Sequence, residues 1–227
     1  MGETGSAEKS RRARSAGEDA ARKDEPAATG TRAGSGRRVQ TVWFPPIADD
    51  RYVTDRAWES AVLDKCPFHP AGGCGLLRHG SYLRVHPAGV RVARFLCPSR
   101  GETISLLPAF LSARLPATLD EVEAAVETVE AAPSVARAAE IARPADDEHA
   151  VTSISAARWV KRRLRPVMAA LVAMVTLLPE LCGCAPTLAA IRERLGQQRV
   201  LVVLRELGRG HLFALPPPLG LHARAGR

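Results

Sequence analysis

Three cysteines and one histidine in the first half of the chain have the residue types and the close spacing of a metal site. The stretch CPFHPAGGC contains Cys66, His69 and Cys74, and Cys97 follows in CPSRG. Thiolates and imidazole nitrogens are typical zinc ligands, and a structural zinc site binds four of them in a tetrahedron. The spacing therefore nominates Cys66, His69, Cys74 and Cys97 as ligands of a zinc ion.

One position departs from the pattern of a zinc ribbon, in which each turn carries two cysteines. Arg100 stands where the second cysteine of the CPSRG turn is expected. Two interpretations stay open. His69 replaces the lost ligand, or the metal has been lost and the cysteines act as small apolar residues. Arg100 favours the second, because a permanent cation beside a metal ion is unfavourable unless it points away.

Short strands and turns should position these residues. Residues 66–108 contain the runs LLRHGSYLRV and VRVARFLC, separated by the turn HPAG, which predict a hairpin. Val90 and Val92 alternate with Arg91, as expected for a hairpin with one solvated face. Before it, residues 55–63 predict a short helix with Trp58 and Val62 on one face.

After Pro116 the pattern changes to that of helices. Thr118 and Glu121 form a capping box ahead of an apolar stripe, which predicts a helix over 118–131. Further helices are expected over 133–143, from 153 onward through Pro166, over 187–195 and over 198–207. The expected fold class is α+β, mainly α, with a small zinc-ribbon-like β-hairpin domain followed by an all-helical C-terminal half.

Composition and charge suggest how the 227 residues divide. Hydrophobic residues make up 46% of the chain and aromatic residues only 4%, so packed helices rich in Leu, Val and Ala are expected. The net charge is +8. We expect a disordered basic arm over 1–39, the ribbon-like domain over 40–117, the helical domain over 118–215 and a flexible tail over 216–227.

The charge pattern and the absence of a signal-like segment favour a cytoplasmic protein with a polyanionic partner. Residues 1–38 are polar and do not resemble a signal peptide. The apolar run over 167–178 is too short to cross a bilayer, so no membrane partner is expected. Residues 118–150 carry nine acidic and two basic groups, whereas residues 151–227 carry three acidic and twelve basic groups. Such blocks are typical of a basic surface beside an acidic segment.

The order CP...CG..LRHGSY.R, a hairpin and then R.LCPSRGETISLLPAFL resembles the N-terminal zinc ribbon of bacterial insertion-sequence transposases and related transposase-like zinc-finger proteins. The resemblance covers about residues 66–115. It implies a zinc ribbon followed by a helix-turn-helix, with DNA as the partner. The helices expected over 118–131, 133–143 and 153–165 would form that motif, and SISAARWVKRRL would be its recognition helix.

The helix that begins at 153 has the amphipathic pattern that such a role requires. At 100° per residue, Ala157, Val160, Leu164, Val167 and Leu171 fall on one face, and most of the cations fall on the opposite face. An apolar face would dock on partner helices and a cationic face would contact phosphates. The candidate DNA contacts are Arg158, Lys161, Arg162, Arg163 and Arg165, with Arg78, Arg84, Arg91 and Arg94 on the hairpin. Alternatively, these arginines pair with the acids of residues 118–150.

An enzyme is not expected. A transposase nuclease needs three separated carboxylates in a sheet to hold two metal ions, and after Glu148 only Glu180, Glu193 and Glu206 remain. We therefore expect a non-catalytic, transposase-derived DNA-binding protein. The alternative is a protein-interaction module or a decayed transposase fragment without DNA affinity. In that case the Leu-rich helices over 167–207 would pack against a partner or, as a homo-oligomer, against a second copy.

Overall fold

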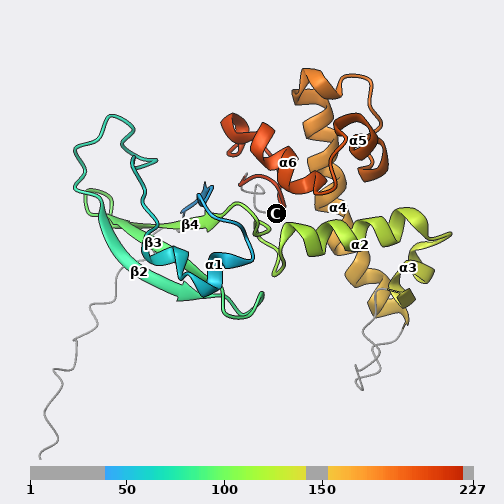
Figure 1. Cartoon of the computed structure of the whole chain (residues 1–227), viewed down its shortest axis with the longest axis horizontal. Helices are drawn as coiled ribbons and strands as arrows, with labels where there is room; N and C mark the ends of the chain where they lie inside the picture. The colour runs from blue at the N-terminus through green and yellow to red at the C-terminus, as the bar shows by residue number, and fades with distance from the viewer. Residues whose placement is uncertain (1–38, 142–152, 222–227) are drawn as a thin grey trace, which may run out of the picture. The chain divides into compact units, whose positions relative to one another are not determined.

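The computed structural model describes residues 39–141 and 153–221, and it describes only the backbone of residues 153–157, 159, 162 and 163. Within these ranges the chain forms a four-stranded mixed sheet and six α-helices, coloured from blue to red along the chain in Figure 1. The expected α+β fold, mainly helical, is therefore confirmed. The basic arm expected over 1–39 lies outside the described residues except for Val39.

The four strands form one sheet in the order β1-β4-β3-β2. Strands β2 (Leu77–Leu83) and β3 (Arg91–Cys97) pair antiparallel as the predicted hairpin, and β4 (Glu102–Pro108) pairs antiparallel with the other side of β3. Strand β1 (Val39–Trp43) pairs in parallel with β4 and was not predicted. The first described residues thus cover an edge of β4 that the hairpin leaves open.

One face of the sheet packs against the segment between β1 and β2. Val90 and Val92 are buried while Arg91 between them is exposed, as the alternation predicts. The hydroxyl of the buried Tyr52 donates a hydrogen bond to the carbonyl of Arg91 at 2.7 Å, which ties this segment to β3. The large buried side chains of this first core include Tyr52, Trp58, Phe95, Ile104, Leu106 and Phe110.

The short helix expected over 55–63 is wrong in its bounds. The chain instead forms α1 (Arg51–Thr54) and a 3₁₀ turn at Ala57–Glu59. Arg56 lies between them with a φ of 51°, in the left-handed region, and a residue in that conformation interrupts a right-handed helix. Trp58 is buried as expected, but the side chain of Val62 is 63% exposed.

The predicted helices of the second half are present. Thr118 and Glu121 form the expected capping box, in which the amide of Glu121 donates to the Thr118 hydroxyl at 3.0 Å. One long helix continues through Pro166. The helices are α2 (Leu119–Ala131), α3 (Val135–Ile141), α4 (Ser153–Leu177), α5 (Leu188–Leu195) and α6 (Val200–Leu207), with 3₁₀ turns at Pro179–Leu181 and Arg209–His211.

These helices enclose a second core. It is built mainly from α2, α4, α5 and α6, with Val122, Val126, Leu171, Met174, Ile191, Leu201 and Leu204 among its buried side chains. Residues 217–221 are buried too, so this part of the tail expected over 216–227 packs against the protein. Among the helices of the described ranges, none combines the length and the apolar character needed to cross a membrane.

Candidate functional site

Cys66, His69 and Cys74 lie on one tight loop that precedes β2. The amide of His69 donates to the carbonyl of Cys66 at 3.0 Å, and the amide of Gly72 donates to the carbonyl of His69 at 2.9 Å. Gly72 and Gly73 have φ values of 88° and 83°, which residues with a side chain rarely adopt. Two consecutive glycines thus allow the loop to fold back between His69 and Cys74.

Cys97 comes from the end of β3, where a second tight turn leads into β4. The amide of Arg100 donates to the carbonyl of Cys97 at 3.2 Å. The hydroxyl of Ser99 donates to the carbonyl of Cys74 at 3.4 Å, so this turn is joined directly to the loop. The fold thereby brings together two segments that are more than twenty residues apart in the sequence.

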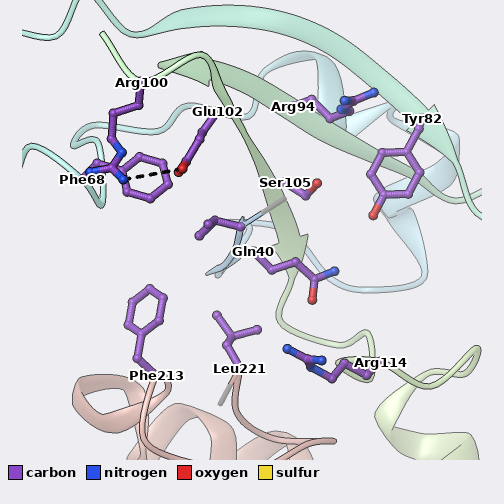
Figure 2. Close-up of a pocket in the computed structure, with 11 residues that line it drawn as sticks. Gln40, Phe68, Tyr82, Arg94, Arg100, Glu102, Ser105, Arg114, Phe213 and Leu221 are labelled. Atoms are coloured by element: carbon purple, nitrogen blue, oxygen red, sulfur yellow. Dashed lines mark ion pairs between the residues drawn. The ribbon is translucent and has the colours of Figure 1, made fainter. Parts of the chain in front are cut away.

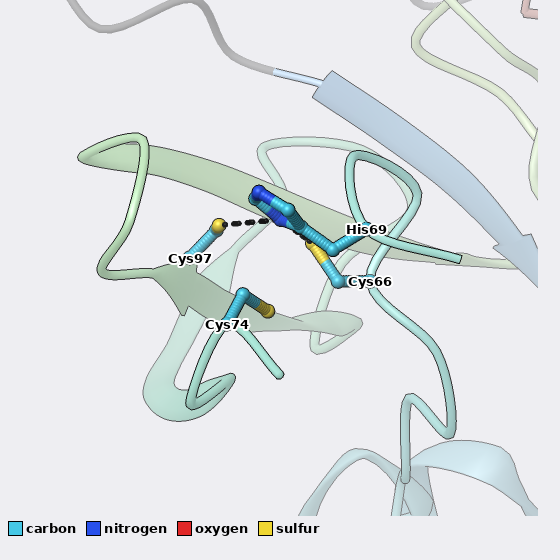
Figure 3. Close-up of side chains that lie close together, drawn as sticks. All are labelled: Cys66, His69, Cys74 and Cys97. Carbon is cyan, nitrogen blue, oxygen red and sulfur yellow. Dashed lines mark hydrogen bonds between the residues drawn. The ribbon is translucent and has the colours of Figure 1, made fainter. Parts of the chain in front are cut away.

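The side chains of the four predicted ligands converge (Figure 3). The Nδ1 atom of His69 lies 3.4 Å from the Sγ atom of Cys97 and 3.6 Å from that of Cys66. With Cys74 included, four ligand atoms lie within 4.8 Å of one another. The three cysteines are buried and His69 is half-buried. The arrangement offers four donor atoms to a single metal ion.

The electrostatic environment differs among the thiols. Burial raises the pKa of the Cys66 thiol, but hydrogen bonds from His69 and from the backbone of Phe68 outweigh it and lower the pKa to about 7. Burial raises the pKa of the Cys74 thiol. Because a cysteine binds a metal ion as its thiolate, Cys66 is the better prepared of the two to begin ligation.

Arg100, the residue at the position of the missing cysteine, contacts an aromatic ring and a carboxylate. Its guanidinium lies 5.1 Å from the centre of the Phe68 ring and 3.6 Å from a carboxylate oxygen of Glu102 (Figure 2). The electrostatic objection to a metal ion is therefore weakened, because Glu102 partly balances the charge of Arg100.

The hairpin arginines have different surroundings from one another. Arg78 donates to the carbonyls of Ala61, at 2.8 Å, and of Trp58. Arg84 donates to the carbonyl of Leu115 at 2.7 Å, and burial lowers its pKa. These two of the nominated DNA contacts thus bind the protein's own backbone.

The other two hairpin arginines donate to no backbone carbonyl within the described ranges. Arg91 is exposed and donates to the hydroxyl of Ser81 at 3.1 Å. Arg94 is half-buried and lines a cavity. Within the described ranges, Arg91 is therefore the one nominated hairpin arginine that is exposed and has no backbone carbonyl as its partner, since Arg78 is exposed but binds two carbonyls.

Helix α4 presents cations on one face and apolar residues on the other. Arg158, Lys161 and Arg165 are exposed, whereas Val160 and Val167 are buried. This pattern agrees with the amphipathic helix that the sequence predicts. The side chains of Arg162 and Arg163, also nominated as DNA contacts, lie outside the described residues.

The acidic side chains of α2 bind elements other than α4. Glu123 accepts hydrogen bonds from the amides of Val200 and Leu201 at the start of α6, at 3.0 and 2.8 Å. Glu130 accepts in the same way from the first amides of α5. These carboxylates satisfy amide groups that a helix leaves unpaired at its N-terminus, and they lie at its positive end.

Two other acids of this segment pair with residues outside α4. Asp120 pairs with Arg199 at 2.7 Å, and Glu121 lies 2.9 Å from the His86 ring. Within the described ranges, no ion pair joins Arg158, Lys161 or Arg165 to an acid. The alternative that the acidic segment neutralises the α4 cations thus has no support from these contacts.

Replacing the buried Glu123 with Ala is expected to destabilise the helical core by about 2–4 kcal/mol. The substitution removes the acceptor for two buried amides and one partner of Arg192, which lies 2.8 Å from the Glu123 carboxylate. The free energy of unfolding in urea measures this loss. Glu193→Ala, at an exposed position, should change it by less than about 0.5 kcal/mol. Equal effects of the two substitutions would contradict the capping role of Glu123.

Arg205 is fully buried, and no role was predicted for it from the sequence. Its guanidinium donates to the carbonyls of Leu219 at 2.9 Å and Ala109 at 2.8 Å, and to those of Leu111 and Pro218. Burial lowers its pKa. The one available signal was an arginine within the apolar run VLVVLREL. This residue ties the segment after β4 to the C-terminal segment.

Comparison with family models, with curated proteins and with solved structures gave no match. The function is therefore argued from the residues of the chain and their geometry.

Proposed function

We propose that the chain is a non-catalytic DNA-binding protein of transposase-like origin, in which zinc stabilises the sheet region and α4 contacts duplex DNA. The observation that carries the DNA part is the exposed row of Arg158, Lys161 and Arg165 on α4. Glu123 and Glu130 of α2 support the proposal because they cap α6 and α5 and do not pair with this row.

Zinc is the metal that the donor set favours. Three thiolates and one imidazole are a common ligand set of structural zinc sites. Bonds of about 2.3 Å to sulfur and about 2.0 Å to nitrogen, at a tetrahedral angle, place the two atoms about 3.5 Å apart. The distances of 3.4 and 3.6 Å between His69 Nδ1 and the two sulfurs agree with this value. With four protein ligands, the ion would be structural.

The dimensions of the α4 row suit the major groove. From Arg158 to Arg165 the helix rises by about 10 Å, and the groove of B-DNA is about 12 Å wide and admits an α-helix. Positions 158, 161 and 165 lie three and four residues apart, so they share one face. We infer that this face binds phosphates and that the apolar face stays on its partner helices.

The transposase-like origin is supported by the order of the elements, a ribbon-like sheet followed by helices. The turn between α2 and α3 spans residues 132–134, a length typical of a helix-turn-helix. Residues 142–152 separate α3 from α4. We therefore propose that α2 and α3 are the paired helices of the motif. The segment 153–165, which was expected to be the recognition helix, would then belong to α4 as a separate basic helix.

The test is the salt dependence of binding to a duplex. Three phosphate contacts should give a slope of about −3 for the logarithm of the association constant against that of the salt concentration, measured by fluorescence anisotropy. The double substitution Lys161→Glu and Arg165→Glu should reduce the slope by about 2 and the affinity by at least about tenfold, because it replaces two attractive contacts with repulsive ones.

A matched control changes the net charge by the same amount at another place. Arg51 and Arg56 are exposed and pair with Asp55 and Glu59 in the first half of the chain. Their double substitution to Glu should leave the slope unchanged. Salt-independent binding, no binding, or equal losses in the two double variants would contradict the proposal.

The alternative of an interaction module receives less support. Most large apolar residues of the helices over 167–207 pack within the second core of the same chain, including Leu171, Met174, Ile191, Leu201 and Leu204. A homo-oligomer through these helices stays a prediction.

A further inference from the structure

A cavity of about 720 Å³ adjoins the sheet, and its lining includes Phe213 and Leu221 from the C-terminal part of the chain (Figure 2). The volume lies within the range of pockets that bind small molecules. Its lining combines cationic, polar and aromatic side chains: Gln40, Phe68, Tyr82, Arg94, Arg100, Glu102, Ser105, Arg114 and Phe213.

The charges of the lining favour an anion. The lining contains three guanidinium groups, those of Arg94, Arg100 and Arg114, and one carboxylate, that of Glu102, which pairs with Arg100. Neither Arg94 nor Arg114 forms an ion pair or a side-chain hydrogen bond with another residue of the described ranges. A guanidinium binds phosphate or carboxylate oxygens through paired donors, so the two remaining arginines suit such a group.

The polar part of the cavity is built on the sheet. Arg94 of β3 lies opposite Ser105 of β4, and Ser105 lies opposite Gln40 of β1. The three side chains therefore form one row across adjacent strands, and Ser105 is only 8% exposed. Groups held by strands keep a more fixed geometry than groups on loops, which is what selective binding requires.

The backbone at Arg114 is strained. Its φ of 63° lies in the left-handed region, which is unfavourable for a residue with a long side chain. Strain of this kind persists where the surrounding structure enforces it and is concentrated at ligand sites. The side chain of Arg114 is one of those that line the cavity (Figure 2).

Aromatic rings supply the other half of the lining. The chain contains only five phenylalanines and two tyrosines, and Phe68, Phe213 and Tyr82 all line this cavity. Phe213 is 57% exposed although it is large and apolar. Aromatic surfaces beside arginines are the combination by which proteins bind a base and its phosphate.

We propose that this cavity binds a nucleoside monophosphate, with the phosphate at Arg94 and Arg114 and the base against Phe213 or Tyr82. The ligand is a free nucleotide or the 5′-phosphorylated end of a strand, which share this chemistry. The proposal does not depend on the binding of duplex DNA by α4.

Calorimetric titration of the full chain tests the proposal with three probes: adenosine 5′-monophosphate, adenosine and inorganic phosphate. The monophosphate should bind at least about tenfold more tightly than either of the others, because only it engages both halves of the cavity. Competition with a trinucleotide, with and without a 5′-phosphate, then separates the two sources. If the ligand is a strand end, the 5′-phosphorylated trinucleotide should displace the bound probe at a lower concentration than the mononucleotide does. If the ligand is a free nucleotide, the mononucleotide should displace it at the lower concentration.

Two substitutions assign the site. Arg94→Gln and Arg114→Gly should each weaken binding of the monophosphate by about tenfold or more, because each removes a charged donor. Arg114→Gly should leave the melting temperature unchanged or raise it, since glycine accepts the positive φ. Arg56→Gly is the matched control, because Arg56 shares the left-handed conformation but pairs with Glu59 outside the cavity. Its binding should equal that of the unmodified chain.

Three results would overturn the proposal: no binding of the monophosphate, binding of inorganic phosphate with equal affinity, or unchanged binding in both cavity variants. The Lys161→Glu, Arg165→Glu double variant should keep full affinity for the monophosphate. Failure here and failure of the α4 proposal are thus distinguishable.

Discussion

Removal of zinc by a chelator is expected to unfold the sheet region while α2, α4, α5 and α6 remain helical. Binding of zinc to four protein ligands contributes about 10–16 kcal/mol in small zinc domains, which equals or exceeds the total stability of most domains, about 5–15 kcal/mol. The sheet region has its own core, distinct from that of the helices. Circular dichroism should show the helical signal retained, and tryptophan fluorescence should report exposure of the buried Trp58.

Single substitutions separate this effect from a general effect of the chelator. His69→Ala should weaken zinc binding and lower the melting temperature of the sheet region without any chelator, because three thiolates leave one position of the tetrahedral site without a protein ligand. His79→Ala changes an exposed histidine of β2 and should leave zinc content and stability unchanged. A chelator-treated chain with an unaltered fluorescence spectrum and melting curve would contradict the structural role of the metal.

Replacing Arg205 with Met is expected to lower the free energy of unfolding by about 3–5 kcal/mol. The substitution keeps the apolar stem but leaves the carbonyls of Ala109, Leu111, Pro218 and Leu219 without their buried donor. Lysine should not restore stability, because its compact ammonium group does not match the planar fork of arginine. Urea unfolding of the zinc-loaded chain measures both variants.

Arg194 provides the control for Arg205. Arg194 is exposed and donates to a single carbonyl, that of Glu180, at 3.0 Å. Its replacement with Met should cost less than about 1 kcal/mol. If Arg205→Met were as mild, the four carbonyl contacts would not be what holds the C-terminal segment in place.

The elements with local signals were predictable. The capping box at Thr118, the helix expected over 187–195 and the alternation around Arg91 each depend on residues within a few positions of one another. Strand β1 was missed because its parallel pairing with β4 joins residues far apart in sequence. The left-handed Arg56 was missed because arginine gives no sign of that conformation.

The metal site was partly predictable. Ligand chemistry nominated Cys66, His69, Cys74 and Cys97, and the structure brings these side chains together. The contacts of Arg100 with Phe68 and Glu102 could not be predicted, because they form only in the folded turns. The roles of Glu123 and Arg205 could not be predicted, because their hydrogen-bond partners lie far away in the sequence. Glu123 binds the amide of Val200, 77 residues away, and Arg205 binds the carbonyl of Ala109, 96 residues away.

X-ray absorption at the zinc edge of the zinc-loaded chain tests the metal site most directly. We expect one zinc ion per chain with three sulfur ligands at about 2.3 Å and one nitrogen ligand at about 2.0 Å. In the His69→Ala variant the nitrogen should be lost or replaced by oxygen. A first shell of oxygen atoms, or an unchanged nitrogen in that variant, would contradict the assignment of His69 as the ligand that takes the place of the missing cysteine.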